Sequence, residues 1–347
     1  MSKPDVIVAG AGIIGVSVAL ELRRRGAEVV VLEKGEPGRE ASPAAAGWLA
    51  FANPETPPPL RPLALASAKL FPEYVADLEE SSSVKVDLRR HGTIAFLRGT
   101  EIPPHYRMLS LDELRRLEPA VDAAGRHAFF AAEGSVDPAL LMQAALRSAA
   151  RHGIEIRSHC AVEALAGSGS QVEVRTRAER LTAKTVIDCR GAWSGVPVKP
   201  RKGQALYLQP DCTDLLQHVV ASPEVYLVPR SSGKIFAGAT VEDVGYDKTV
   251  QPEVIRQLHA AAARLVPQLA SATVIECWAG LRPGTPDDLP LLGATATPGL
   301  FLASGHFRNG ILLAPVTARI MGDLAMGKGP SADISAFSPL RFAPIPA

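Results

Sequence analysis

Three glycines near the beginning of the chain have the spacing of a phosphate-binding turn. Gly10, Gly12 and Gly15 lie in the run Gly-Ala-Gly-Ile-Ile-Gly, and the acidic residue Glu33 follows further along the chain. In such a motif the first glycine permits a tight turn, the second lets the backbone approach a pyrophosphate, and the third allows close helix packing. A carboxylate placed like that of Glu33 binds ribose hydroxyls. These residues predict a dinucleotide site, with NAD and FAD both open at this point.

The elements expected around these glycines strengthen that interpretation. Residues 5–9 form a short apolar run typical of a buried strand, residues 13–25 have helical spacing, and residues 27–32 resemble a second buried strand. A strand, turn, helix and second strand closed by an acid is the context that the motif requires. The helix would direct its N-terminal amides and positive dipole end at the phosphates.

Two further segments are suited to close approach of backbone and ligand. Residues 39–49 contain a run of small residues, so their backbone could lie against a planar ligand, although an alanine-rich core helix is an equally good interpretation. Residues 185–193 read as a strand that runs into a glycine turn at Gly191. The second segment favours a second contact with the same ligand.

The middle of the chain predicts a second lobe inserted into the first. Residues 54–62 are rich in proline, which fixes its own φ and disfavours helix in the residue before it, so we expect a loop there. Residues 63–80 have helical spacing, and Ser110 with Glu113 forms a capping box. After Pro138 helix and strand alternate again, so the first lobe is discontinuous in sequence.

The predicted fold class is therefore α/β. It combines a discontinuous Rossmann-like nucleotide-binding lobe with an inserted α+β substrate lobe built on an antiparallel sheet. Strand-like segments dominate residues 201–240, which supports the antiparallel sheet. The expected ranges are 1–55, 134–200 and 275–330 for the nucleotide-binding domain, 56–133 and 201–274 for the substrate-binding domain, and 331–347 for a C-terminal tail.

Composition narrows the class of partner. The chain has 347 residues, of which 47% are hydrophobic, and 37 basic residues nearly balance 36 acidic ones. This balance gives no reason to expect nucleic acid or an anionic membrane as a partner. The four cysteines stand far apart without the spacing of a zinc site, so no metal is expected. Glycines interrupt the apolar stretch at residues 6–20, so we expect no integral membrane association and a cytoplasmic location.

Two C-terminal motifs resemble a known family. Residues 278–290 and 305–315, together with the glycine turn and the segments at 44–47, 134–138 and 201–204, are similar in order to the D-amino-acid oxidase family of flavoproteins. Within that family the similarity is to the glycine oxidases of thiamine biosynthesis. It covers nearly the whole chain.

The resemblance implies FAD in place of NAD and makes the first lobe the FAD-binding domain. Members with covalently attached flavin use a cysteine near the position that Leu281 and Arg282 fill here, so the resemblance implies non-covalent FAD. Further along, the helix after residues 308–310 would lie beneath the flavin. The cofactor-binding positions expected on this basis are Gly10, Gly12, Ile13, Ile14, Gly15, Glu33, Lys34, Ser42, Ala45, Ala46, Gly47, Leu49, Val162, Gly191, Trp193, Gly203, His306, Arg308, Asn309, Gly310, Ile311 and Leu312.

The resemblance also implies a substrate site. Arg282 would clamp the substrate carboxylate with two parallel hydrogen bonds, Tyr226 would donate a further one, and Arg308 would line the pocket near both flavin and substrate. The alternatives are a structural salt bridge for Arg282 and an ordinary strand aromatic for Tyr226. His306 is expected to be structural rather than catalytic. The other residues expected to line the pocket are Glu224, Val241 and Trp48.

The implied reaction is transfer of a hydride from the α-carbon of a small amino acid, with glycine the leading candidate, to flavin N5. The imine would give an oxo acid, glyoxylate for glycine, and ammonia, while oxygen would become hydrogen peroxide. Relatives suggest a homo-oligomer. Glu224 and Val241 leave room for sarcosine or a larger D-amino acid, and an oxidase and a dehydrogenase that reduces a quinone both remain open. An NAD-dependent dehydrogenase and a non-catalytic flavin-binding module are the alternatives from other classes.

Overall fold

The strand, turn, helix and strand expected at the start of the chain are all present. β1 (Val6–Ala9) leads through the glycine turn into α1 (Ile13–Arg24), and β2 (Val29–Leu32) lies parallel to β1. Gly10 has a φ of +101°, and a Cβ atom there would lie 2.5 Å from the carbonyl oxygen of Cys189. The turn therefore needs glycine both for its backbone conformation and for its contact with a neighbouring strand end.

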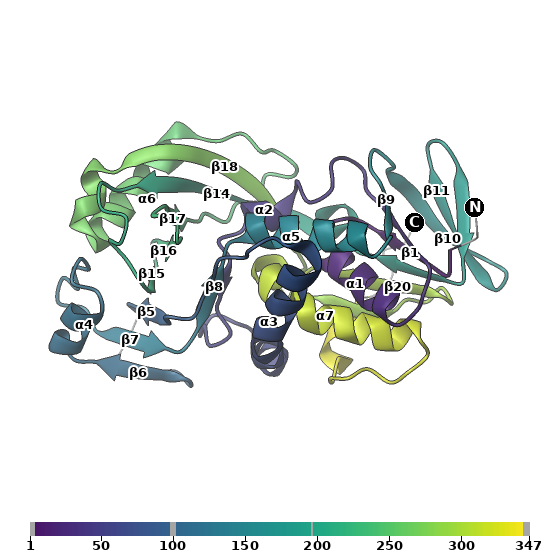
Figure 1. Ribbon diagram of the computed structural model, residues 1–347, viewed down its shortest axis with the longest axis horizontal. Coiled ribbons are helices and arrows are strands. Elements are labelled where there is room, and N and C mark those ends of the chain that lie inside the picture. Colours follow the sequence, from purple (N-terminus) through teal and green to yellow (C-terminus); the bar gives the residue numbers. More distant parts are fainter. Residues whose placement is uncertain (1–3, 98–101, 196, 343–347) are drawn as a thin grey trace.

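Two lobes lie side by side in the computed structural model, which describes residues 4–97, 102–195 and 197–342 (Figure 1). The sheet of the first lobe has the order β19-β20-β13-β1-β2-β9, parallel except between β19 and β20. Its other strands are β9 (Glu155–Arg157), β13 (Thr185–Asp188), β19 (Leu291–Ala294) and β20 (Leu300–Ser304). This is the Rossmann-like arrangement that the sequence predicts.

Both faces of this sheet are covered. On one face Val8 shares an apolar core with helices α1, α3 (Arg61–Ser82), α5 (Pro138–Arg151) and α7 (Gly310–Ala325). On the other face Ile7 packs among apolar residues of a three-stranded sheet. The strands of that sheet are β10 (Val162–Ser168), β11 (Gln171–Thr176) and β12 (Arg180–Ala183). Burial on both faces explains why β1 is apolar at every position.

An eight-stranded sheet forms the second lobe, in the order β18-β14-β17-β16-β15-β5-β7-β6. Its neighbours are antiparallel except β15 and β5, which are parallel. The strands are β5 (Thr93–Ala95), β6 (Tyr106–Leu109), β7 (Ala128–Ala131), β14 (Lys199–Gln209), β15 (Val219–Ala221), β16 (Tyr226–Pro229), β17 (Ile235–Gly238) and β18 (Thr273–Gly284). Figure 1 shows the long strands β14 and β18 reaching from this lobe towards the first.

Smaller elements complete the two lobes. Helix α6 (Pro252–Leu265) contacts β14 and β17, and α4 (Leu111–Leu117) begins with the expected capping box of Ser110 and Glu113. Where the lobes meet, β3 (Trp48–Leu49) and β4 (Leu88–Arg89) both pair with β8 (Gly134–Val136). Within the described residues, no helix is both long and apolar enough to span a lipid bilayer.

The predicted fold class is confirmed, but two local predictions were wrong. The loop expected at 54–62 is shorter, because a 3-10 turn covers Pro58–Leu60 and α3 begins at Arg61. Prolines at the first positions of a helix lose no hydrogen bond, so they start helices as well as end them. The core-helix alternative for the small residues is wrong, since α2 (Ala41–Ala44) is one helical turn without a buried residue, followed by extended backbone, whereas contact of this backbone with a planar ligand stays a prediction.

The domain ranges stay a prediction, and two of their boundaries fall at informative places. The boundary expected at residue 275 lies within β18, which pairs with β14 along its length. Helix α3, expected in the substrate-binding domain, shares the apolar core of the first lobe. Residues 1–3 of the FAD-binding domain and 343–347 of the predicted tail lie outside the described residues, as do 98–101 and 196.

Candidate functional site

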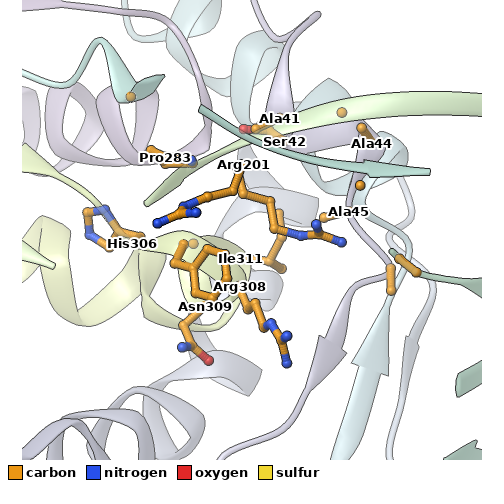
Figure 2. A pocket seen from close by; sticks show the side chains of 18 of the residues that line it. Ala41, Ser42, Ala44, Ala45, Arg201, Pro283, His306, Arg308, Asn309 and Ile311 are labelled. Atoms are coloured by element: carbon orange, nitrogen blue, oxygen red, sulfur yellow. The ribbon is translucent and has the colours of Figure 1, made fainter. Parts of the chain in front are cut away.

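A cavity of about 1230 Å³ opens between the two lobes. Its walls come from the glycine turn, from the residues that follow β2 and β13, from α2, and from strands β14, β16 and β18. Pockets for small ligands usually measure about 300–1000 Å³, so this one has room for a large ligand and a small second molecule. Figure 2 shows Arg201, His306 and Arg308 around the same cavity.

The glycine turn and the end of β2 meet at one end of this cavity. The buried carboxylate of Glu33 accepts hydrogen bonds from the backbone N–H groups of Ala11 at 2.8 Å and Gly35 at 3.1 Å. A carboxylate has about four acceptor positions, so two remain for ribose hydroxyls. The Oγ of Ser42 accepts from the N–H of Ile13 at 3.0 Å, which leaves its own proton free to donate. These groups fit the ribose and phosphates of a dinucleotide.

The other two glycines of the turn keep side chains out of the space at the start of α1. A Cβ atom at Gly15 would lie 1.9 Å from the carbonyl oxygen of Gly10, so the helix packs directly on the turn. A Cβ atom at Gly12 would lie 3.3 Å from Ser42 Oγ, inside the cavity wall. Bare backbone therefore faces the cavity where a pyrophosphate would lie, and the turn fits the nucleotide part of FAD.

Charged and aromatic groups surround the same end of the cavity. Lys34 Nζ lies 3.7 Å from the centre of the Trp193 ring and 2.6 Å from Glu40 Oε1. Glu40 also pairs with Lys248, from the second lobe. Partial burial opposes ionisation of Glu40, but hydrogen bonds from Lys248 and Lys34 outweigh it and lower its pKa. Glu40 is therefore a carboxylate at neutral pH, and its contacts join the two lobes.

Aromatic side chains form another part of the wall. The rings of Tyr226 and Phe236 are stacked, with centres 5.7 Å apart and planes at 15°, and the Trp48 ring lies 5.7 Å from Tyr226. Trp48 Nε1 donates to Thr93 Oγ1 at 2.9 Å and to Glu133 Oε2 at 2.8 Å. These bonds fix the indole, so this wall is rigid and mostly apolar.

Arg282 of β18 lines the same cavity. Its Nη1 donates to the carbonyl oxygen of Thr240 at 2.9 Å, and its guanidinium lies directly over Gly203 of β14. Among the described residues, no carboxylate lies within ion-pair distance of this guanidinium, which argues against the structural salt bridge. A half-buried guanidinium with donors to spare suits a ligand carboxylate.

Arg308, Arg201 and His306 also line the cavity. Arg308 Nη1 lies 2.9 Å from Glu55 Oε2, and both side chains are about half exposed or more. Arg201 Nη1 lies 3.0 Å from Asp243 Oδ2 at the surface. His306 is buried, and its Nε2 lies 3.1 Å from Thr317 Oγ1. Burial lowers the pKa of His306 to about 3, so the ring is neutral at pH 7, which supports a structural role.

Most of the expected site residues lie on this one cavity. All of them line it except Gly15, Leu49 and Leu312, which are buried behind its wall. Glu224 and Val241 lie at exposed parts of the wall, and Glu224 Oε2 accepts a hydrogen bond from Ser222 Oγ at 2.9 Å. The structure thus brings together segments from both ends and the middle of the chain. The individual roles of these residues stay predictions.

Sequence reasoning did not assign several charged residues that line the cavity, among them Glu40 and Arg201. Glu40 stands just before α2, and no local pattern indicates its contacts with Lys34 and Lys248. Arg201 had a usable signal, because it lies two positions before Gly203 on β14 and so shares its face of the strand. It is also directly opposite Arg282 across the two strands.

Comparisons with known proteins agree with this geometry. A family model described as FAD dependent oxidoreductase (DAO) matches residues 5–324. The glycine oxidase of Pseudomonas putida is 32% identical, with 98% of this chain and 99% of that protein covered. The crystal structure of glycine oxidase from Geobacillus kaustophilus is 31% identical and covers 99% of this chain and 100% of that chain, with a TM-score of 0.92.

A third relative is longer than this chain. The bifunctional protein ThiO/ThiG of Synechocystis is 35% identical over 97% of this chain, which spans about half of that protein's length, 54%. Family model, relatives and solved structure therefore agree over nearly the whole chain. The chain belongs to the DAO family of FAD-dependent oxidoreductases.

Proposed function

We propose that this chain is an FAD-dependent amino acid oxidase of the glycine oxidase type. The observation that carries the proposal is the guanidinium of Arg282, which has no carboxylate partner among the described residues and lines the same cavity as the rings of Tyr226 and Trp48. A planar, charged fork next to an apolar wall suits a small amino acid whose carboxylate must be held in one orientation. The glycine oxidases among the relatives support the same substrate class.

The cofactor site supports non-covalent FAD. Glu33 would bind ribose, the turn at Gly12 and the Ser42 hydroxyl would bind phosphate, and the amides at the start of α7 would lie near the flavin. When bound, FAD supplies an acceptor for a hydride from the substrate α-carbon.

The chain's own residues orient the substrate. Arg282 would hold the carboxylate through two charge-assisted hydrogen bonds, and Tyr226 would add a third from its hydroxyl. The packed rings of Trp48 and Phe236 support Tyr226 and exclude water from this side. His306 is neutral, buried and bonded to Thr317, so it supports the wall rather than moving a proton.

With oxygen as acceptor, the overall reaction converts glycine, oxygen and water into glyoxylate, ammonia and hydrogen peroxide. The imine product would hydrolyse in water without help from a residue. The alternative is a dehydrogenase of the same family that acts on a D-amino acid or sarcosine and passes electrons to a quinone. The exposed carboxylate of Glu224 at the cavity wall favours a D-amino acid with a longer basic side chain, such as D-lysine, since it would attract the side-chain ammonium group.

Anaerobic reduction of the flavin tests the proposal. Glycine, sarcosine, D-alanine and D-lysine are added separately to the purified protein without oxygen, and bleaching of the flavin band is followed. Rapid bleaching by glycine supports the glycine oxidase type, and bleaching by another amine alone reassigns the substrate. A protein that remains colourless with added FAD would contradict the proposal. An oxygen electrode and a quinone dye then separate the oxidase from the dehydrogenase.

The role of Arg282 is tested by substitution. Arg282→Ala is expected to raise the KM for substrate severely and to leave the flavin spectrum intact, because the guanidinium would contact substrate and not cofactor. Arg256→Ala is the matched control, since Arg256 is an exposed arginine on α6 that pairs with Glu253. Loss of flavin from Arg282→Ala, or an unchanged KM, would show that the assigned role is wrong.

A further inference from the structure

A fully buried lysine lies on the strand beside Arg282, one residue after Arg201, which pairs with Arg282. The lysine pairs with Leu281, so its side chain points to the other face of the sheet. Lys202 of β14 has 0% exposure, and its Nζ lies 3.6 Å from Glu242 Oε2 and 3.4 Å from Asp247 Oδ2. An unpaired buried ammonium costs several kcal/mol, so this charge holds the segment that carries its partners in place. The proposed cofactor and substrate contacts do not use Lys202. Its burial therefore needs another explanation.

The carboxylate of Glu242 connects the lysine to Thr240. Glu242 Oε1 accepts hydrogen bonds from Thr240 Oγ1 and from Gln204 Nε2, the latter at 2.9 Å. Thr240 Oγ1 in turn accepts from the backbone N–H of Gln204 at 2.9 Å. Burial opposes ionisation of Glu242, but hydrogen bonds from Thr240 and Gln204 and the charge of Lys202 lower its pKa. Glu242 is therefore a carboxylate at neutral pH, and it fixes the Thr240 side chain.

The backbone of Thr240 then reaches Arg282. Its carbonyl oxygen accepts from Arg282 Nη1 at 2.9 Å. The same guanidinium lies over Gly203, where a Cβ atom would stand only 2.1 Å from Nη1. Arg282 is thus held between a strand backbone and one carbonyl group. The position of that carbonyl depends on the contacts of Thr240 and Glu242 with β14.

We propose that Lys202 and Glu242 are positioning residues for substrate recognition, which orient Arg282 through Thr240. The inference rests on the proposed function, because it assumes that Arg282 binds the substrate carboxylate. Neither residue lines the cavity, so neither would touch the substrate. A guanidinium forms two parallel hydrogen bonds only when both donor nitrogen atoms point at the carboxylate. Because the guanidinium is planar and rigid, a carbonyl group that fixes one nitrogen atom also fixes the direction of the other.

Binding of acetate to the holoenzyme tests this inference. Acetate has the carboxylate of glycine without the amine, and its binding is followed through the flavin absorption spectrum. Thr240→Val removes the hydroxyl that bonds to Glu242 and is expected to raise the acetate Kd on the order of tenfold, since misplacement by about 1 Å can cost up to about 10²-fold. Thr240→Ser retains the hydroxyl and is expected to restore most of the affinity.

Two charge variants test the contacts that connect Lys202 and Glu242 to Thr240. Lys202→Met and Glu242→Gln are each expected to raise the acetate Kd and the KM for glycine more than they lower kcat. The double variant Lys202→Met with Glu242→Gln is expected to show less than the sum of the two effects, because both changes act on one connected group. Additive effects would contradict the path from Lys202 through Glu242.

Controls separate this inference from the proposed function. Glu253→Gln changes an exposed carboxylate on α6 that pairs with Arg256, and it is expected to leave acetate affinity unchanged. Affinity for FAD, measured on the apoprotein, is expected to stay the same in every variant, and a parallel loss of FAD would show a general structural defect and overturn the inference. If Arg282→Ala leaves acetate binding unchanged, the proposed function is wrong. If Arg282→Ala weakens binding but Thr240→Val and Lys202→Met do not, only the positioning role is wrong.

Discussion

Gly203 lies where any side chain would displace the guanidinium of Arg282. A Cβ atom at this position would stand 2.1 Å from Nη1, 2.4 Å from Nη2 and 2.5 Å from Cζ. Non-bonded heavy atoms prefer about 3.5–4.0 Å, so Gly203→Ala must push the guanidinium away by more than about 1 Å. The clash involves only the far end of a flexible side chain, so the strands can stay paired. We expect a folded protein with a misplaced clamp.

The size of the effect follows from the hydrogen bonds that the clamp would make. Hydrogen bonds to charged groups contribute about 1.5–3 kcal/mol each. Loss of one of the two hydrogen bonds therefore weakens the free energy of carboxylate binding by about 2 kcal/mol, and loss of both weakens it by about 4 kcal/mol. At about 1.4 kcal/mol for each factor of ten, the affinity for a carboxylate falls about 30-fold to about 700-fold. We expect this fall in the acetate Kd and in kcat/KM for glycine.

The assay compares Gly203→Ala in two backgrounds. In the wild-type background the acetate Kd rises as stated while the affinity for FAD remains the same, because Gly203 would act through Arg282 rather than through the cofactor. In the Arg282→Ala background the clash is gone, so Gly203→Ala is expected to change little. A large further loss in that background would refute the reasoning, and so would loss of FAD from the single variant.

The other predictions concern the cofactor turn, a buried histidine and a helix cap. Gly12→Val is expected to give a folded protein that elutes from gel filtration without FAD, because a branched side chain would fill the approach to the pyrophosphate, and stoichiometric FAD in that variant would contradict the assignment of the turn. Burial lowers the pKa of His306 from 6.5 to about 3, so the unfolded chain takes up a proton that the folded chain excludes, and the free energy of unfolding falls as the pH drops below 6.5. The free energy of unfolding of the wild type should fall by about 2 kcal/mol between pH 7.5 and 5, and this contribution should be absent from His306→Gln when both are measured by urea unfolding. The same pH dependence of the free energy of unfolding in both proteins would count against the neutral, buried ring. Asp137 caps the start of α5, because its Oδ1 accepts hydrogen bonds from the N–H groups of Ala139 and Leu140. Asp137→Ala should therefore lower the free energy of unfolding by about 1 kcal/mol in the same assay, whereas no change would mean that another group replaces the cap.

The sequence by itself determined the parts of this protein that depend on neighbouring residues. The turn at Gly10 has a positive φ that glycine tolerates, and the apolar runs on either side of it have the spacing of a strand and a helix, so the nucleotide-binding unit was predictable. The cap of α4 at Ser110 was predictable for the same reason. The resemblance of the C-terminal motifs then indicated FAD, which the family match confirms.

Only the tertiary structure decided which distant residues meet. The register of β14 and β18 places Gly203 beneath Arg282, a contact that the sequence did not predict, and its expected contact with the cofactor stays a prediction. The bond from Trp48 to Glu133 and the network from Lys202 to Thr240 also join segments with no common local pattern. Such contacts depend on strand pairing and on how the chain crosses between lobes, and these are settled by burial of the whole core rather than by the residues on either side.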